Sequence, residues 1–283
     1  MRTTGQGALG LIAGEGNLPV QGARYAREVG RALVCVAFQD LADPCLAESA
    51  DEILWIQPGE VARGLAFLRE HGVREAVLAG KVAKQGLFGD RGALLLDETA
   101  RSLLGDLPDL SDVKLFEGVA AVLEQAGISL LPQWSLDPAL RVGVGPLGKV
   151  SPSDVQQRDI EFGLPIARGL AGQGIGQSIV VKQGVVLAVE AVEGTDAALR
   201  RAGALTKGGV AIKVARPGQD PRFDLPVIGP RTVEILRASH IAVLAFEAEA
   251  TLVLDRDRLV READAADIAV VGAALPGRSR GAP

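Results

Sequence analysis

Several residue types that mark common enzyme classes are scarce in this sequence. Histidine occurs only as His71 and His240, which excludes a histidine-rich metal site. Cys35 and Cys45 are the only cysteines and lack a metal-ligand spacing, so we expect structural thiols in a reducing compartment. The sequence has no Gly-x-x-x-x-Gly-Lys-Ser/Thr loop, and its one Gly-x-Ser-x-Gly match, Gly277-Arg-Ser-Arg-Gly281, lies outside any expected strand or helix. The sequence therefore argues against P-loop enzymes and against serine hydrolases whose nucleophile elbow joins a strand to a helix.

Long apolar runs and clusters of basic residues are also missing. No apolar stretch reaches the ~18 residues that a membrane-spanning helix requires, and the first residues do not form a secretory signal. The net charge is −5, without the clustered Lys and Arg that nucleic-acid phosphates require, so no nucleic acid is expected as a partner. We expect a cytoplasmic protein, with contact to a membrane surface left open.

The composition that remains is that of an ordinary globular protein. The 283 residues are 48% hydrophobic and 23% charged, enough for one large domain or two of ordinary size. In the first half, short apolar runs alternate with stretches of helical periodicity. Strands are expected at 8–13, 32–37, 52–56 and 76–79, and helices at 20–29 and 61–70. This alternation predicts a Rossmann-like parallel α/β domain over residues 1–132.

The second half has a different organisation. Residues 133–150 are rich in proline and glycine and predict an interdomain linker. A helix is expected from Ser153, followed by two strands within 178–189 that turn at Gln183-Gly184. The later strands and helices do not alternate regularly, so residues 151–283 predict a mixed α/β domain, in which we place the catalytic residues.

A glycine-rich turn follows the first expected strand. Gly14-Glu-Gly-Asn-Leu-Pro19 joins a strand to a helix, a geometry that offers backbone N–H groups to a phosphate. The third glycine of the dinucleotide fingerprint is absent, so a tight turn without a ligand explains the motif equally well. Lys81 follows another strand and belongs to the same rim of a parallel sheet, unless it is only a surface lysine. The substrate-binding candidates here are Gly14, Gly16, Asn17, Leu18 and Lys81.

An acidic stretch closes the expected strand pair of the second half. Glu190, Glu193 and Asp196 crowd around Gly194, with the hydroxyl of Thr195 beside them. Carboxylate oxygens at a strand-to-helix junction suit a hard cation such as Mg²⁺. The alternative is an ordinary helix start, with Thr195 or Asp196 as the N-cap.

A second acidic stretch is stiffened by Pro217, Pro221 and Pro226. Here Asp220 and Asp224 flank Arg222. The aspartates could hold divalent cations, and Arg222, Lys213 and Lys207 could neutralise phosphate oxygens. The alternative is a surface loop with an Asp220–Arg222 ion pair, worth ~0–1 kcal/mol.

Six motifs in chain order carry a resemblance to a known family. They are Gly14-Glu-Gly-Asn-Leu-Pro19, Gly80-Lys-Val82, Leu147-Gly-Lys-Val-Ser-Pro152, Ile175-Gly-Gln177, Leu187-Ala-Val-Glu-Ala-Val-Glu-Gly-Thr-Asp196 and Gln219-Asp-Pro-Arg-Phe-Asp-Leu-Pro-Val-Ile-Gly-Pro-Arg-Thr232. With these motifs the chain resembles the LpxI-type UDP-2,3-diacylglucosamine pyrophosphatases. The resemblance covers nearly the whole chain, and the motifs of its second half are the more specific.

The resemblance implies hydrolysis of UDP-2,3-diacylglucosamine to UMP and 2,3-diacylglucosamine 1-phosphate, called lipid X, during lipid A biosynthesis. It also implies two domains that hold the substrate between them, a need for Mg²⁺, and attack at the phosphorus nearer the sugar. The family's catalytic aspartate lies in an Arg-x-Asp-x-Pro motif, which here is Arg222-Phe-Asp224-Leu-Pro226. The partner is then a nucleotide-linked diacyl glucosamine lipid, met at the inner face of the inner membrane.

Together, the residues and the resemblance predict a site. Other divalent cations are alternatives to Mg²⁺, and a homodimer is one option for the assembly. The catalytic candidates are Asp224, Glu193, Asp196 and Lys213; the metal ligands are Asp224, Asp220 and Glu193; and further substrate contacts are Gln177, Thr195, Arg222 and Thr232.

One departure and two rival functions remain. Where family members often have Gly-Asp-Asp-x-x-Leu, this chain has Leu110-Ser-Asp-Val-Lys-Leu115, with Val113 replacing a carboxylate. A non-catalytic binding protein for nucleotide-linked lipids would explain the glycine turn without needing two acidic stretches. A nicotinamide-dependent dehydrogenase would use the first domain, although the missing third glycine counts against it.

Overall fold

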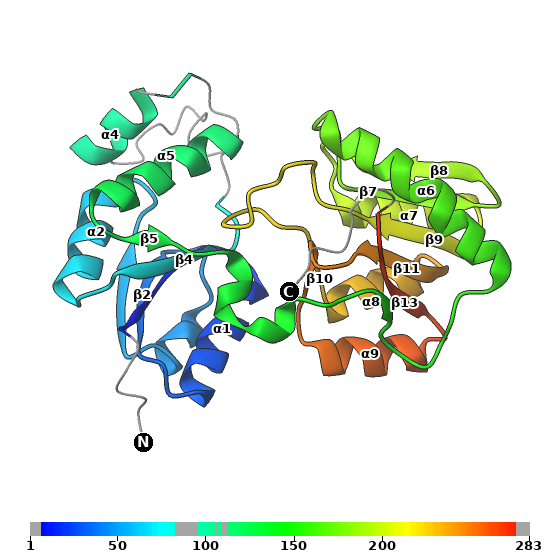
Figure 1. Cartoon of the computed structure of the whole chain (residues 1–283), viewed down its shortest axis with the longest axis horizontal. Helices are drawn as coiled ribbons and strands as arrows, with labels where there is room; N and C mark the ends of the chain where they lie inside the picture. The colour runs from blue at the N-terminus through cyan, green and yellow to red at the C-terminus, as the bar shows by residue number, and fades with distance from the viewer. Residues whose placement is uncertain (1–6, 83–95, 106, 109–111, 276–283) are drawn as a thin grey trace. The chain divides into compact units, whose positions relative to one another are not determined.

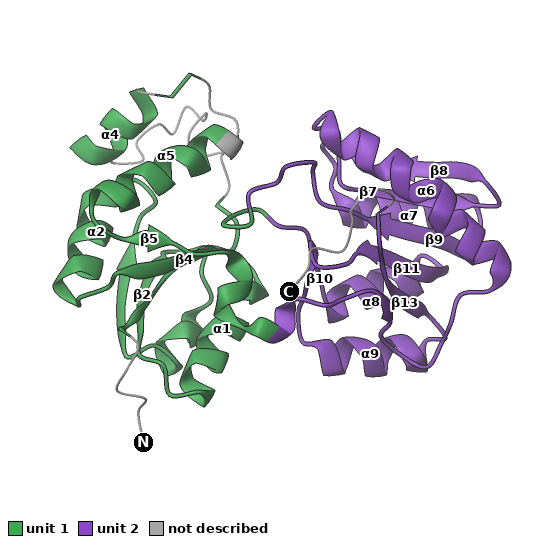
Figure 2. Cartoon of the chain, in the orientation of Figure 1, with its two compact units in different colours: residues 1–138, 221–224 green, residues 139–220, 225–283 purple. Residues whose placement is uncertain are grey.

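The chain folds into two compact units, coloured separately in Figure 2. The computed structural model describes residues 7–82, 96–105, 107–108 and 112–275. Unit 1 comprises Met1–Pro138 and Pro221–Asp224, and unit 2 comprises Ala139–Asp220 and Leu225–Pro283. A short piece from the second half of the sequence therefore belongs to the first unit.

Unit 1 is built on a five-stranded sheet in the order β3-β2-β1-β4-β5, with every neighbouring pair parallel (Figure 1). Its strands are almost wholly apolar, as expected when helices cover both faces of a parallel sheet. The strand order reverses between β1 and β4, which confirms the predicted Rossmann-like fold. The strands are β1 (Leu9–Ala13), β2 (Leu33–Phe38), β3 (Glu52–Ile56), β4 (Glu75–Ala79) and β5 (Ser129–Leu130).

Helices connect these strands. Helix α1 begins at Asn17 rather than at the predicted position 20, so that Pro19 lies inside its first turn, where no intrahelical N–H bond is lost. Helix α4 begins at Glu98, and residues 83–95 lie outside the described part. The helices are α1 (Asn17–Glu28), α2 (Val61–Glu70), α4 (Glu98–Gly105) and α5 (Asp112–Gln125), with 3-10 turns η1 (Pro44–Glu48) and η2 (Gln133–Leu136).

Unit 2 contains a six-stranded sheet in the order β6-β13-β11-β9-β7-β8. The β9-β11-β13 part is parallel, whereas β7 pairs antiparallel with both β8 and β9. The predicted mixed α/β class is therefore confirmed. The strands are β6 (Gly145–Pro146), β7 (Ser178–Lys182), β8 (Val185–Val189), β9 (Gly209–Lys213), β11 (Ile241–Glu247) and β13 (Ala269–Ala273), and a separate pair joins β10 (Val227–Ile228) to β12 (Leu252–Val253).

The helices of unit 2 pack on this sheet and divide its core into separate apolar clusters on either side. Ser153 caps α6 as predicted, and its hydroxyl accepts from the Gln156 N–H. The stretch 133–150 contains η2, a second 3-10 turn η3 (Pro138–Leu140), and strand β6. The helices are α6 (Asp154–Gly172), α7 (Thr195–Leu205), α8 (Pro230–Ala238) and α9 (Arg256–Ala265).

Both cysteines are free thiols of unit 1. Cys35 is fully buried in β2, and this burial raises the pKa of its thiol to about 12. Burial, followed by the hydrogen bond with Asp43, also raises the pKa of the Cys45 thiol. Both thiols are therefore protonated at neutral pH, which makes them poor nucleophiles.

Among the described residues, no helix combines the length and the hydropathy needed to cross a membrane.

Candidate functional site

The carboxyl ends of β1 and β4 form one edge of the unit 1 sheet, and the chain segments that leave them cross in close contact. Glu15 and Lys81 form an antiparallel bridge, with Glu15 N donating to Lys81 O at 2.8 Å and Lys81 N donating to Glu15 O at 2.9 Å. Gly14 N also donates to Ala79 O at 2.8 Å. This edge is the strand-order reversal of the sheet, where α/β folds of this kind bind their ligands.

Gly14 is required by this crossing. A Cβ atom at Gly14 would lie 2.5 Å from the Lys81 carbonyl oxygen, and one at Gly80 would lie 2.6 Å from the Gly14 carbonyl carbon. Gly80 also has a φ of +89°, in the region that favours glycine. Gly14 therefore allows two backbone segments to pack closely, because its α-carbon faces the backbone of Lys81.

Replacing Gly14 by alanine is expected to lower the free energy of unfolding by about 1–3 kcal/mol. The added methyl group would clash with backbone atoms of Lys81, which cannot rotate away as a side chain can. Thermal unfolding of the Gly14→Ala variant measures the effect. Gly169→Ala in α6 is the control, since its new Cβ meets nothing within 4 Å. That variant should be unchanged or more stable by about 0.5–1 kcal/mol. Equal melting temperatures for both variants would contradict the packing role of Gly14.

The start of α1 lies at the same edge. Gly16 has a φ of +112°, and a Cβ there would meet nothing within 4 Å. Asn17 is exposed, whereas Leu18 is buried in the core at 5% exposure. No acidic side chain lies in the first helical turn and no side chain caps it. The first N–H groups of α1 and the positive end of its dipole are therefore suited to an anion, with Lys81 exposed beside the turn.

Residues 221–224 are held at this edge by a buried glutamine. Gln133 is 4% exposed; its side-chain amide donates to Leu78 O in β4 at 2.9 Å, and its backbone N–H donates to Pro221 O at 2.9 Å. Phe223 is 4% exposed and stacks on Phe116 of α5, with ring centroids 4.9 Å apart. The segment therefore belongs to the core of unit 1 near the end of β4.

Arg222 is held within the same unit. Its guanidinium lies 3.2 Å from a carboxylate oxygen of Glu124 and 5.8 Å from the centroid of the Phe223 ring. The surface-loop alternative supposed an ion pair between Arg222 and Asp220. In the structure Arg222 forms an ion pair with Glu124 of α5, which helps to fix the position of the segment on unit 1.

Asp224 is exposed between two buried neighbours. Phe223 and Leu225 are 4% and 7% exposed, so the backbone is anchored on both sides of the carboxylate. Asp224 has a φ of +55°, in the left-handed region that residues other than glycine seldom occupy. Such conformations concentrate at functional sites, because the surrounding structure must hold them. Asp224 is thus an exposed residue with a left-handed backbone between two buried residues.

A cluster of polar side chains in unit 2 joins the ends of β8 and β9 to the start of α7. The ammonium group of Lys213 donates to the Thr195 hydroxyl at 2.9 Å and to the Ser178 hydroxyl at 3.2 Å. The Thr195 hydroxyl in turn donates to Glu190 Oε1 at 2.8 Å. The other carboxylate oxygen of Glu190 is buried without a hydrogen-bond partner in the described structure. This cluster presents one cation, two hydroxyls and one incompletely satisfied acceptor.

The other two carboxylates of the 190–196 stretch point to different partners. Glu193 pairs with Arg201 at 2.7 Å, and Asp196 with Arg231 at 3.3 Å. A backbone hydrogen bond from Glu193 itself, and then Arg201, hold the pKa of the Glu193 carboxyl below its usual range. No three His, Cys, Asp or Glu side chains of the described residues are grouped as metal ligands.

Helix α7 begins differently from either predicted N-cap. Its N-cap is Gly194, with a φ of +82°, so Thr195 and Asp196 are its first two residues. No side chain caps the helix. The Thr195 hydroxyl is directed to Glu190 and Lys213, which explains why it does not cap the helix.

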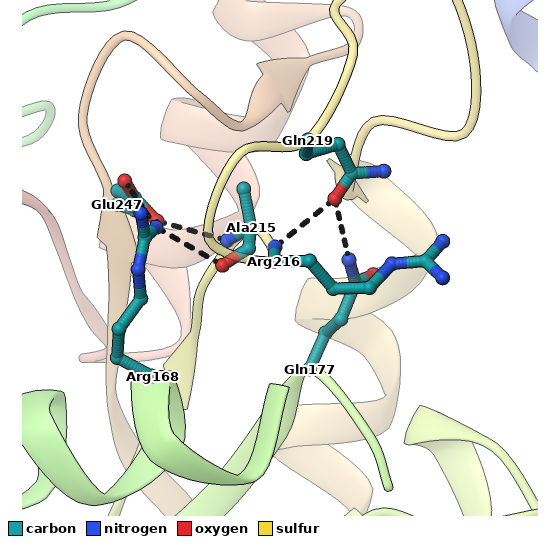
Figure 3. A network of polar contacts seen from close by, with 6 residues as sticks. All are labelled: Arg168, Gln177, Ala215, Arg216, Gln219 and Glu247. Carbon is teal, nitrogen blue, oxygen red and sulfur yellow. Dashed lines mark hydrogen bonds and ion pairs between the residues drawn. The ribbon is translucent and has the colours of Figure 1, made fainter. Parts of the chain in front are cut away.

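The remaining candidates stabilise loops. The Gln177 amide donates to Gln219 Oε1 at 2.9 Å, which also accepts from Arg216 N at 3.0 Å (Figure 3). The Thr232 hydroxyl accepts from Gly229 N at 3.1 Å at the start of α8. Asp220 is partly buried and lies directly after Gln219. In the departure at 110–115, residues 110 and 111 lie outside the described part, and α5 begins at Asp112.

Sequence reasoning did not identify Ser178 or Gln219 as contacts of the candidate residues. It also did not identify the ion pair of Arg168 with the buried Glu247, in which Nη1 lies 2.8 Å from Oε2. Ser178 and Glu247 could have been noticed, because each is a polar residue at the end of an apolar strand. Arg168 gives no such signal, since it lies among the other polar residues of an amphipathic helix.

Comparisons with solved structures give only weak likenesses. A biotin carboxylase from Campylobacter jejuni is 12% identical, aligned over 70% of this chain and 42% of its own, with a TM-score of 0.28. The biotin carboxylase domain of the Hydrogenobacter thermophilus 2-oxoglutarate carboxylase is 16% identical over 62% of this chain and 35% of its own, with a TM-score of 0.27. The alignments thus span less than half of either solved chain, and TM-scores this low support no conclusion about the protein described here.

A comparison with curated proteins gives a full-length relative. The UDP-2,3-diacylglucosamine pyrophosphatase LpxI of Caulobacter vibrioides is 34% identical over 276 residues, which are 93% of this chain and 96% of that protein. The family models of the LpxI N-terminal and C-terminal domains match residues 8–140 and 143–271. The chain therefore belongs to the LpxI family.

Proposed function

We propose that this protein hydrolyses the pyrophosphate bond of UDP-2,3-diacylglucosamine to UMP and 2,3-diacylglucosamine 1-phosphate, in the biosynthesis of lipid A. The observation that carries the proposal is the exposed Asp224, held in a left-handed turn between buried neighbours, in a member of the LpxI family.

Asp224 is the proposed catalytic residue. Its carboxylate accepts a hydrogen bond from the attacking water, orients that water toward the phosphorus nearer the sugar, and receives its proton. The bond from that phosphorus to the bridging oxygen breaks, and UMP leaves with the bridging oxygen. A fixed backbone favours this role, because a general base must be placed within hydrogen-bond reach of the proton that it removes.

The second requirement of the reaction is that the negative charge of the phosphates be neutralised. Lys213 is the proposed cation in unit 2, and Thr195 and Ser178, which contact its ammonium group, orient it. In unit 1, Lys81 and the open first turn of α1 supply a second anion-binding element. Preorganised donors of this kind stabilise charge that develops in the transition state.

Mg²⁺ is the proposed cofactor, and the carboxylate oxygens of the site are ligands of the kind that it prefers. Magnesium is usually held by one or two carboxylates, with waters and substrate phosphate oxygens completing its ligands, so it needs no cage of protein side chains. Asp224 is the proposed ligand, with Asp220 as the second. Glu193 is a weaker candidate than its sequence position indicated, because Arg201 occupies its carboxylate. When bound, the ion neutralises phosphate charge and acidifies a bound water.

The proposed location follows from the substrate. A nucleotide-linked lipid is met at a membrane surface, so we propose a cytoplasmic protein that contacts the inner face of the inner membrane. A homodimer is retained as a proposal for the assembly.

The test is release of UMP from UDP-2,3-diacylglucosamine by the purified full chain. With Mg²⁺ present we expect UMP and the sugar phosphate in equal amounts, and chelation by EDTA should stop turnover until Mg²⁺ is restored. In ¹⁸O-labelled water the label should enter the sugar phosphate, because the water attacks that phosphorus. Binding without UMP release would favour a carrier protein, and label in UMP would place the attack at the other phosphorus.

A further inference from the structure

A buried ion pair in unit 2 holds the backbone that follows Lys213. Glu247, the last residue of β11, is 1% exposed, and its two carboxylate oxygens lie 2.9 and 2.8 Å from Nη1 of Arg168 in α6. The same Nη1 donates to Ala215 O at 3.1 Å, and Glu247 Oε2 accepts from Ala215 N at 2.9 Å. Figure 3 shows the pair converging on Ala215. Both backbone polar groups of this one residue are therefore bonded to the pair.

The backbone N–H groups on either side of Ala215 are also fixed, each by a different partner. Val214 N donates to Gln177 O at 2.9 Å. Arg216 N donates to Gln219 Oε1 at 3.0 Å, and Gln219 N donates back to Arg216 O at 3.1 Å. Three consecutive N–H groups are thus bonded to groups outside the strand ladder. A segment held in this way cannot shift without breaking several hydrogen bonds, of which that from Ala215 N to Glu247 is buried.

The burial of Glu247 makes the position of Ala215 costly to change. A carboxylate removed from water requires a cation and further hydrogen bonds to balance its lost hydration. Arg168 and Ala215 N supply these, so any displacement of Ala215 would leave a buried charge less well satisfied. The pair therefore couples the position of Ala215 to two rigid elements, α6 and β11.

We propose that Arg168 and Glu247 are positioning residues for hydrolysis: they fix Ala215 and, through it, the segment from Lys213 to Asp220. The inference rests on the proposed function, since Lys213 is the phosphate cation there. Only Val214 separates Lys213 from Ala215, so displacement of Ala215 would move the ammonium group relative to Thr195 and Ser178. Neither Arg168 nor Glu247 touches substrate in this role.

The contacts of Arg168 allow a test by conservative rescue. All of its hydrogen bonds to Glu247 and Ala215 come from one nitrogen, Nη1. A lysine ammonium group carries three donors and can replace that nitrogen, whereas methionine fills the space without donors. We expect Arg168→Met to lower kcat by about 10- to 100-fold, the cost of a misplacement of about 1 Å. Arg168→Lys should stay within about fivefold of the wild type, and KM should change little in both.

Arg141→Met is the matched control. Arg141 forms an ion pair of 2.8 Å with Glu249 in the same unit, but both side chains are about half exposed (45% and 48%). The kcat of the Arg141→Met variant should equal that of the wild type. If Arg168→Met folds poorly, the double variant Arg168→Met/Glu247→Leu removes both charges, avoids an unpaired buried carboxylate, and should show the same loss of kcat.

A second measurement separates this inference from the proposed function. Hydrogen exchange of the amides of residues 214–216, 218 and 219 needs no substrate, and it should be faster in Arg168→Met than in Arg141→Met. Unchanged exchange, or a kcat of wild-type size in folded Arg168→Met, would overturn the positioning role. A wild-type chain that releases no UMP would instead overturn the proposed function and leave the exchange result to decide on the pair.

Discussion

Asp224→Asn is expected to lower kcat for UMP release by about 10³-fold, within the range for removal of a positioned general base. Asparagine has nearly the same shape as aspartate and tolerates the left-handed backbone, with its φ of +55°, better than alanine does. The substitution therefore removes the carboxylate charge while keeping the turn. The measurement is the initial rate of UMP release, accompanied by thermal unfolding to verify the fold.

Asp40→Asn is the control for backbone conformation. Asp40 is an exposed aspartate of the same unit, with a φ of +61°. Its substitution should leave the rate and the melting temperature unchanged. Near-normal turnover by Asp224→Asn would remove Asp224 from the chemistry, whereas retained substrate binding without turnover would support the assignment.

Lys213→Met is expected to lower kcat by about 10²-fold, the usual effect of losing one donor to a developing charge. The loss should fall mainly on kcat if the ammonium group contacts the transition state more strongly than the substrate. Methionine keeps the length of the side chain, so the apolar packing beneath β9 should be retained. Steady-state kinetics over a range of substrate concentrations provide both constants.

Lys182→Met is a chemically matched control. Lys182 is also a strand lysine of unit 2 that donates to a threonine hydroxyl, that of Thr206, at 2.9 Å. It lies at the opposite end of β7 from Ser178, so its loss should leave both constants unchanged. If the two lysine variants lost activity to the same extent, Lys213 would have no special part in the reaction.

Local structure followed from the sequence where short-range signals agree. Helix α2 and strand β3 have the predicted ends, because the periodicity of their apolar residues changes sharply at their boundaries. The turn at Gln183-Gly184 was also predicted, and both residues have positive φ values of 49° and 74°. These features depend on a few neighbouring residues, which is why one sequence is enough to find them.

The site was less predictable, because it depends on where side chains point. Glu190, Glu193 and Asp196 are neighbours in sequence, yet Glu190 turns inward to Thr195 while the other two pair with separate arginines. Arg168 and Glu247 are 79 residues apart and meet only after the sheet has formed. Neither result can be read from composition or spacing, since each depends on tertiary packing.

The packing of Phe223 in unit 1 has a consequence for folding during synthesis of the chain. A fragment ending at Pro138 would contain every strand of the first sheet but would lack the ring that stacks on Phe116. During synthesis from the N-terminus, more than 80 further residues emerge before Phe223 can stack on Phe116. The contacts of unit 1 are therefore completed by a segment that is made late, and the same segment carries Asp224.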